Sequence, residues 1–248
     1  MNDLDIFFLS FSESNADENW QHLSSRFPRA KRVHGIKGVK NAHKVVAAQS
    51  STPFFFLIDG DNRVSDDFNF SIDFKPRLDT LYVWRAINPV NGLCYGFGAM
   101  KLYNRDILTR TCDGKVVDVA TTVAPKYHII HSVASTTHFN ASPLEAWRGA
   151  FRESAKLQLN CFKNPADMHS YNRLETWTSK GHESLHGTWA LLGARQGREF
   201  AQSHWQNLEA MAQINDFDWL DSIFKKATEK TVLQPSENIL LTNQTLPL

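Results

Sequence analysis

The sequence predicts an α/β protein in which a mixed sheet is flanked by helices and followed by C-terminal helices. Three observations predict this class. The run "FFFLI" at 54–58 is apolar without alternation, as in a strand buried on both faces. Strand-like and helix-like segments alternate through the first 65 residues, which is typical of parallel strands joined by crossover helices. Helical periodicity dominates from residue 142 onward.

The composition indicates one compact globular domain over residues 1–248. Hydrophobic residues make up 42% of the chain, enough for a sizeable core. The 27 basic and 26 acidic residues nearly balance, which excludes a protein that coats polyanions through its net charge. Three cysteines without C-x-x-C spacing argue against disulfides and a thiolate zinc site: Cys94, Cys112 and Cys161. No secretory or membrane-spanning segment stands out, so we expect a cytoplasmic protein without a membrane partner.

The first third of the chain reads as strand, helix, strand, helix, strand. We expect a strand within 5–13 and a surface helix over 15–26, capped by Asn15 or Asp17. A short strand or loop at 30–38 precedes a helix that starts at residue 39. The buried strand at 54–58 completes this part.

The remaining segments change in character along the chain. Strict alternation at 68–74 and β-rich composition at 80–87 and 92–108 predict antiparallel additions to the sheet. Ser142 and Pro143 can start a helix, which is followed by a loop region up to residue 187. Closing helices are expected over 188–205 and 208–228, and the last twenty residues read as a surface tail.

Two carboxylates follow the most buried strand directly. Asp59 and Asp61 flank Gly60 at its end, where ligands of open parallel sheets bind. Magnesium and manganese suit such a pair, because these ions take one or two protein carboxylates and fill their other positions with phosphate oxygens and water. The alternative is that "DGDN" is a simple β-turn.

The first 65 residues resemble the glycosyltransferases of the GT-A fold. The matching segments are "SFSE" after the first strand, "GVKNAHKVVAAQ" and "FFFLIDGDN". The resemblance implies a Rossmann-type nucleotide-binding half at 1–65, an acceptor-side half at 66–205 and a C-terminal helix and tail at 206–248. It also implies a UDP-sugar donor and Mn²⁺ or Mg²⁺. The implied nucleotide-sugar-binding residues are Ser10, Ser12, Lys40, Asn41, Asp59, Gly60 and Asp61, with the metal on Asp61 and near Asp59.

A second stretch resembles a group of bacteriophage glycosyltransferases, several of which are implicated in adding sugars to hydroxymethylated pyrimidines of phage DNA. It comprises "VVDVATTVAP" and "THFNASPLEAWRGAFRESAKL". This resemblance implies 5-hydroxymethylcytosine or a related base in double-stranded DNA as the acceptor, within a host cytoplasm. A glycan or lipid acceptor remains the alternative, as does a non-catalytic nucleotide-binding module.

Two acidic residues are candidates for the general base that an inverting transferase needs. Asp118 follows "KVV", which reads as a strand, and matches the region of the GT-A pattern where an acidic residue meets the acceptor. Its alternative role is a helix or turn cap. Glu153 is the second candidate, and it could instead pair with Arg148 or Arg152. A retaining enzyme would need no such base.

The segment "HESLH" matches the H-E-x-x-H pattern of zinc peptidases. On a helix, that spacing places two imidazoles on one face to bind zinc. Here Gly181 and Gly187 bracket the motif and no third ligand follows at the usual spacing, so a peptidase is the weaker reading. The GT-A resemblance instead implies that His186 completes the metal site.

Aromatic and basic side chains supply the remaining candidates. Rings could stack on a base or sugar, although core packing is the alternative for Trp84, Tyr95, Phe97 and Trp147. We take four residues as acceptor-side candidates: Trp84, Trp147, Arg148 and Arg152. A basic group between Arg29 and Lys44 could meet phosphates or serve as a solvated surface.

Overall fold

The computed structural model describes residues 4–109 and 116–232, and the chain divides into two compact units after Ala141. Unit 1 contains the sheet and unit 2 is helical. Together they confirm the predicted class, a mixed α/β sheet flanked by helices with C-terminal helices. Cys112 and the tail from residue 233 lie outside the described residues.

Unit 1 alternates strands and helices as expected over its first sixty residues. Its strands are β1 (Asp5–Ser10), β2 (Lys31–His34), β3 (Phe54–Asp59), β4 (Asn62–Val64), β5 (Thr80–Ile87), β6 (Cys94–Asn104) and β7 (Lys126–Thr137). Its helices are α1 (Ala16–Arg26), α2 (Val39–Gln49), α3 (Arg105–Thr109) and α4 (Val119–Val123). The predicted helix at residue 39 and the buried strand at 54 begin where the sequence patterns begin.

The strands form one sheet in the order β2-β1-β3-β6-β5-β7-β4. Strand β1 pairs in parallel with both β2 and β3. Strand β6 is antiparallel to β3 and β5, and β5 is parallel to β7. The carboxyl ends of β1, β2, β3, β5 and β7 therefore lie at the same edge, which is called the carboxyl edge below.

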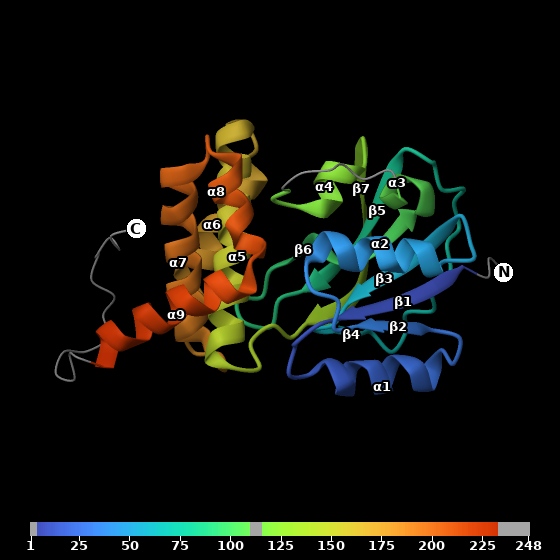
Figure 1. Cartoon of the computed structure of the whole chain (residues 1–248), viewed down its shortest axis with the longest axis horizontal. Helices are drawn as coiled ribbons and strands as arrows, with labels where there is room; N and C mark the ends of the chain where they lie inside the picture. Colours follow the sequence, from blue (N-terminus) through green and yellow to red (C-terminus); the bar gives the residue numbers. More distant parts are fainter. Residues whose placement is uncertain (1–3, 110–115, 233–248) are drawn as a thin grey trace. The chain divides into compact units, whose positions relative to one another are not determined.

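Helices and aromatic side chains cover both faces of the sheet. In Figure 1, α1 and α2 lie on opposite faces. Leu23 of α1 packs with Phe8 and Phe56, while Val46 of α2 packs with Phe7 and Phe55. Because consecutive side chains of β3 enter different clusters and both clusters are buried, this strand carries the unbroken apolar run seen in the sequence.

The alternating segment 68–74 is irregular, so the prediction of a strand there is wrong. Its apolar side chains still point to the sheet: Phe68, Phe70 and Phe74 pack against the cluster on the α1 face. Phe70 has a φ of 55°, which a strand cannot contain. The alternation therefore reflects one buried side of a covering loop rather than a hydrogen-bonded ladder.

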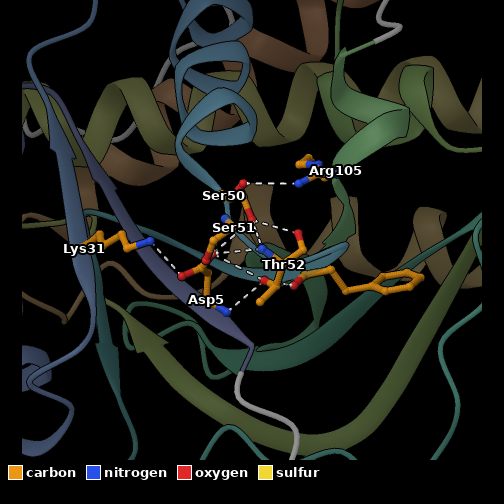
Figure 2. Close-up of polar contacts among 7 residues, drawn as sticks. Asp5, Lys31, Ser50, Ser51, Thr52 and Arg105 are labelled. Atoms are coloured by element: carbon orange, nitrogen blue, oxygen red, sulfur yellow. Dashed lines mark hydrogen bonds and ion pairs between the residues drawn. The ribbon is translucent and has the colours of Figure 1, made fainter.

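The amino-terminal ends of β1 and β3 are held together by one carboxylate (Figure 2). Asp5 accepts hydrogen bonds from the backbone N–H groups of Ser51 (2.6 Å) and Thr52 (3.2 Å), and from Lys31 Nζ (2.8 Å). Burial works to raise the pKa of Asp5, but hydrogen bonds from Lys31 and Ser51 outweigh it and hold the pKa well below the usual range. The carboxylate of Asp5 is therefore engaged in structural hydrogen bonds at this edge of the sheet.

Unit 2 consists of helices α5 (Pro143–Lys163), α6 (Met168–Ser179), α7 (Gly187–His204), α8 (Leu208–Ala212) and α9 (Phe217–Val232), with a 3-10 turn η1 (Gln213–Asn215). The predicted start of α5 is confirmed, since Ser142 Oγ accepts from the Glu145 N–H and Pro143 follows it. Helix α6 occupies most of the segment that was expected to be loop. Its buried residues Ser170, Leu174, Trp177 and Thr178 have helical spacing.

Helices α5 and α7 approach each other closely at two glycines. A Cβ atom on Gly193 would lie 2.1 Å from the carbonyl oxygen of Trp147, and one on Gly197 would lie 2.1 Å from that of Phe151. Only glycine fits at either position without moving a backbone. The close approach of α7 to α5 therefore requires that Gly193 and Gly197 carry no side chain.

The division after residue 141 differs from the expected boundaries after 65 and 205. Strand β4 begins only three residues after β3 and pairs with β7, with Asn62 opposite Thr137. The sheet thus continues well past residue 65, and this long-range pairing leaves no local signal. In the described part of the chain, no helix combines the length and apolar character needed to cross a bilayer.

Candidate active site

Polar side chains meet at the carboxyl edge of the sheet. Ser10 ends β1, His34 ends β2 and Asp59 ends β3. Ser10 is opposite His34 in the register, and Leu9 is opposite Asp59. This edge is where open parallel sheets bind ligands, so three neighbouring strands deliver their last residues to the expected place.

The turn that joins β3 to β4 carries the two predicted carboxylates and is held on several sides. Asn19 Nδ2 donates to the Gly60 carbonyl at 3.0 Å, and the His138 N–H donates to the Asp61 carbonyl at 2.7 Å. A Cβ on Gly60 would lie 2.7 Å from Glu13 Oε2 and 2.8 Å from Ser10 Cβ. Gly60 is therefore required by close packing.

Asp59 forms an ion pair that sequence reasoning missed. Lys101 Nζ lies 2.8 Å from both Asp59 Oδ1 and Asp59 Oδ2. The lysine side chain is 6% exposed and the aspartate 40% exposed. The available signal was a lysine in the middle of "GAMKLY", where every neighbour is apolar or small.

Asp61 is oriented by a buried asparagine. Asn62 is 1% exposed, and its Nδ2 donates to Asp61 Oδ1 at 2.8 Å. Asn62 Oδ1 accepts from the hydroxyls of Ser135 and Thr137 in β7. Because hydroxyl donors occupy the amide oxygen, the amide nitrogen must face the carboxylate.

Negative charge accumulates around Asp61. Burial, together with the charges of Asp59 and Glu13, raises the pKa of Asp61 to about 7, against smaller opposing effects of a backbone hydrogen bond and Lys101. Glu13 is held in place by the Phe11 N–H, which donates to its Oε2 at 2.7 Å. A cation beside Asp61 would relieve this repulsion.

Ser10 and Ser12 differ in their access to a nucleotide. Ser12 is exposed, whereas Ser10 is 2% exposed. Ser10 Oγ accepts from Arg32 Nε at 3.0 Å and lies 2.9 Å from His34 Nδ1. Arg32 Nη2 also lies 3.4 Å from His34 Nδ1; since guanidinium N–H groups only donate, Nδ1 is the acceptor and the ring proton of His34 resides on Nε2. The exposed His34 thus carries the outward donor of this group.

Lys40 and Asn41 lie in the first turn of α2, as the resemblance implied. Asn41 is exposed, and its Nδ2 lies 3.4 Å from the Lys37 carbonyl. Further along the helix, His43 is buried and its Nδ1 bonds to the Val39 carbonyl at 2.7 Å. Burial, together with the charge of Lys101, lowers the pKa of His43 to about 4.

Asp118 directly precedes α4, and the preceding residues are irregular, so the strand expected at "KVV" is absent over its described residues 116 and 117. The Thr122 N–H and hydroxyl both bond to the Asp118 carbonyl. The charges of Asp118 and Asp59 both act on His43 and on Tyr103. Val119, which follows Asp118, packs in the same cluster as Val46 and Tyr103, so this segment lies on the α2 face of the sheet.

Trp84, an acceptor-side candidate of unit 1, is a core residue. It is 3% exposed and packs against Phe56 and Phe68, with ring centroids 5.3 and 6.0 Å apart. A ring without exposed surface has no face to offer a ligand in this conformation.

The acceptor-side candidates of unit 2 all make internal contacts. Trp147 is fully buried, and its indole N–H donates to Gln196 Oε1 at 2.7 Å. Arg148 lies 3.5 Å from Asp221, and Arg152 donates to the Ile214 carbonyl at 2.9 Å. These contacts fasten α9 and η1 to α5.

Glu153, the second base candidate, forms an ion pair with Lys156 at 2.8 Å, three residues along the same helix. Lys156 is thus a partner of Glu153 that the sequence analysis did not consider. Glu153 belongs to unit 2, whereas Asp118 belongs to unit 1.

The "HESLH" segment does not form a helix. Residues 182–186 form turns, and His186 adopts a left-handed conformation with a φ of 54° before α7 begins. His182 Nδ1 lies 3.2 Å from Glu183 Oε2. Residues 182–186 therefore do not form the helical face on which a zinc peptidase places its two histidines, and the H-E-x-x-H match does not indicate a peptidase.

A metal ion at this turn would need oxygen atoms from a bound phosphate compound in addition to those of the protein. Over residues 4–109 and 116–232, no three His, Cys, Asp or Glu side chains gather in a way that could hold a metal ion. The Asp59–Asp61 turn fits an ion shared with phosphates, because magnesium and manganese need few protein oxygens in such sites. Asp61 is the better metal ligand of the two carboxylates, since Lys101 already donates hydrogen bonds to both oxygens of Asp59.

No protein-family model matches the sequence, and no curated protein matches it. Among solved structures, the chain resembles the crystal structure of HddC from Yersinia pseudotuberculosis. The TM-score is 0.32 and the identity 15%, over 54% of this chain and 71% of HddC.

Proposed function

We propose that this protein transfers a sugar from a nucleoside diphosphate sugar to a hydroxyl group, with Mn²⁺ or Mg²⁺ bound at Asp61. One observation carries the proposal: the acidic turn 59–61 lies at the carboxyl edge of the sheet, beside the ends of β1 and β2. Sequence resemblance to GT-A glycosyltransferases covers the same elements. UDP-sugars are the donors that this resemblance favours.

The residues of the turn would act on the donor in different ways. Asp61 would bind the cation, with its carboxylate oriented by Asn62. The bound cation would supply neutralisation of the negative charge that develops on the departing diphosphate. Gly60 lets the turn pack closely against Ser10 and Glu13, where a side chain would not fit. The outward Nε2–H of His34 would donate to an acceptor atom of the nucleotide.

The chemical step would exchange one bond to the sugar for another. A bond forms between the acceptor oxygen and the anomeric carbon, and the bond from that carbon to the diphosphate breaks. In an inverting reaction, the acceptor proton passes to a base, for which Asp118 is the first candidate and Glu153 the second. In a retaining reaction the departing diphosphate can take the proton, and neither residue is required.

The acceptor is proposed from sequence resemblance. The segment that contains Asp118 and Glu153 resembles phage enzymes implicated in modifying hydroxymethylpyrimidines, so double-stranded DNA with 5-hydroxymethylcytosine is the first acceptor to test. The nearly balanced charge of the chain favours neither DNA nor a glycan or lipid.

The test is release of UDP from a panel of UDP-sugars with Mn²⁺, with and without hydroxymethylated DNA, simple sugars or a lipid carrier. We expect metal-dependent turnover with one acceptor class, and loss of turnover in Asp61→Asn. The control is Asp67→Asn, which changes an exposed aspartate six residues away. Binding of UDP without turnover on any acceptor would instead support a non-catalytic nucleotide-binding module. Equal turnover by the parent and Asp61→Asn would disprove the role of the turn.

A further inference from the structure

A buried positive charge, the ammonium of Lys101, lies directly beside the acidic turn 59–61. Lys101 projects from β6, where it is opposite Leu57 of β3 in the antiparallel register. Its ammonium lies 2.8 Å from each oxygen of Asp59. With 6% of the side chain exposed, the lysine cannot exchange this partner for water without leaving the core.

The two aspartates of the turn therefore have different electrostatic partners. Asp59 faces a fixed ammonium that bonds both of its oxygens. Asp61 receives one amide hydrogen bond, from Asn62 to its Oδ1, and it is surrounded by the negative charges of Asp59 and Glu13. A divalent cation that approached Asp59 would be repelled by the nearby ammonium, whereas one at Asp61 would meet net negative charge.

We infer that Lys101 serves as a built-in cation for Asp59 and thereby confines divalent-cation binding at the turn to Asp61. The inference rests on the proposed function and refines it. Lys101 is a specificity-determining residue that sets which carboxylate of the turn binds the cation, and Asp59 is a positioning residue that holds the ammonium.

The test measures Mn²⁺ binding by electron paramagnetic resonance of the free ion, without nucleotide. In Lys101→Met, the freed Asp59 carboxylate joins Asp61, and we expect the Kd for Mn²⁺ to fall about tenfold. In Asp59→Asn, the buried Lys101 ammonium loses its counter-ion beside Asp61, so the Kd is expected to rise. The double variant Asp59→Asn/Lys101→Met removes both charges together, and its Kd is expected to match that of the parent, because Asp59 is not a ligand there.

A matched control uses a second lysine–aspartate pair of the same unit. Lys126 Nζ lies 2.7 Å from Asp79 and is 56% exposed. Lys126→Met should leave Mn²⁺ binding unchanged, which separates a local effect of Lys101 from a change in net charge.

The outcomes separate this inference from the proposed function. Unchanged or weaker Mn²⁺ binding by folded Lys101→Met overturns the inference, as does a tenfold loss in the double variant. If Lys101→Met fails to fold, the double variant decides the question, because a loss of binding there would make Asp59 a ligand in the parent. A parent without turnover on any donor and acceptor would refute the proposed function, yet a new Mn²⁺ site in Lys101→Met would still support the inference.

Discussion

Asn62 donates a hydrogen bond to Asp61 at 2.8 Å while its amide oxygen accepts from Ser135 and Thr137. The end of β7 thus determines the direction of a carboxylate that lies more than seventy residues earlier in the chain. Every polar atom in this set is buried or half-buried, so its hydrogen bonds are costly to lose.

Asn62→Ala is expected to lower the free energy of unfolding by about 2 kcal/mol, because two buried hydroxyls lose their acceptor. Urea unfolding followed by circular dichroism measures this change. Ser135→Ala, which removes one donor and leaves the contact with Asp61, should cost about 1 kcal/mol. Equal stability of Asn62→Ala and the parent would contradict the buried network.

Because its pKa is lowered in the folded state, His43 is expected to reduce the stability of the protein in mild acid. Its pKa is lowered to about 4 in the folded state from 6.5 in the unfolded chain, so the stabilisation is present above pH 6.5 and lost as pH falls towards 4. Burial and Lys101 cause the shift, while Asp59 and Asp118 oppose it. The full effect is about 3 kcal/mol. The stability of the parent relative to His43→Gln, taken from urea midpoints, should therefore fall between pH 7 and pH 5, since the difference at each pH removes the opposite contribution of Asp61.

The raised pKa of Asp61 gives the free energy of unfolding the opposite pH dependence in metal-free protein. Its pKa is raised to about 7 from 3.8, so the stabilisation is present below pH 3.8 and lost as pH rises through 7. Asp61→Asn should therefore be more stable than the parent at pH 8, by ~2–4 kcal/mol. Adding Mn²⁺ should raise the melting temperature of the parent but not of the variant. A variant less stable than the parent at pH 8 would contradict the charge environment described for Asp61.

Gly197→Ala is expected to lower the free energy of unfolding by ~1–3 kcal/mol, because the added methyl would lie 2.1 Å from the carbonyl oxygen of Phe151. Thermal unfolding measures the loss. Gln202→Ala, at an exposed position of the same helix, should leave the melting temperature close to that of the parent. Only if α5 and α7 were farther apart would both variants behave alike.

His34→Phe is expected to weaken UDP binding about tenfold by removing the outward Nε2–H while keeping a flat ring. Isothermal titration with UDP, uridine and inorganic diphosphate shows which part of the nucleotide loses the contact. His131→Phe, at another exposed histidine of unit 1, serves as the control. Identical UDP affinity in the parent and His34→Phe would remove His34 from the proposed site.

Local patterns predicted much of the fold. The apolar run of β3 and the Ser142-Pro143 start of α5 have their causes within a few residues, so they could be located from the sequence. Helix α6 was missed because its sequence is polar and its apolar spacing rests mainly on Leu174 and Trp177. The segment 68–74 misled because a covering loop can bury alternate side chains as a strand does.

The candidate site was predicted only in part. Asp59, Gly60 and Asp61 could be found because they follow β3 directly. Lys101 could not be paired with Asp59, since their sequence separation of 42 positions is bridged by an antiparallel register that no local pattern encodes. For the same reason, sequence reasoning assigned Ser10 to the ligand, although β2 delivers both partners that bury it.

The carboxylate of Asp5 has a practical consequence for engineering. It joins the first strand to the connection between α2 and β3, and a peptide tag or new chain terminus placed within residues 50–52 would sever several of those bonds at once. The hairpin around Gly92 is the safer insertion point, because a side chain there would meet no atom within 4 Å.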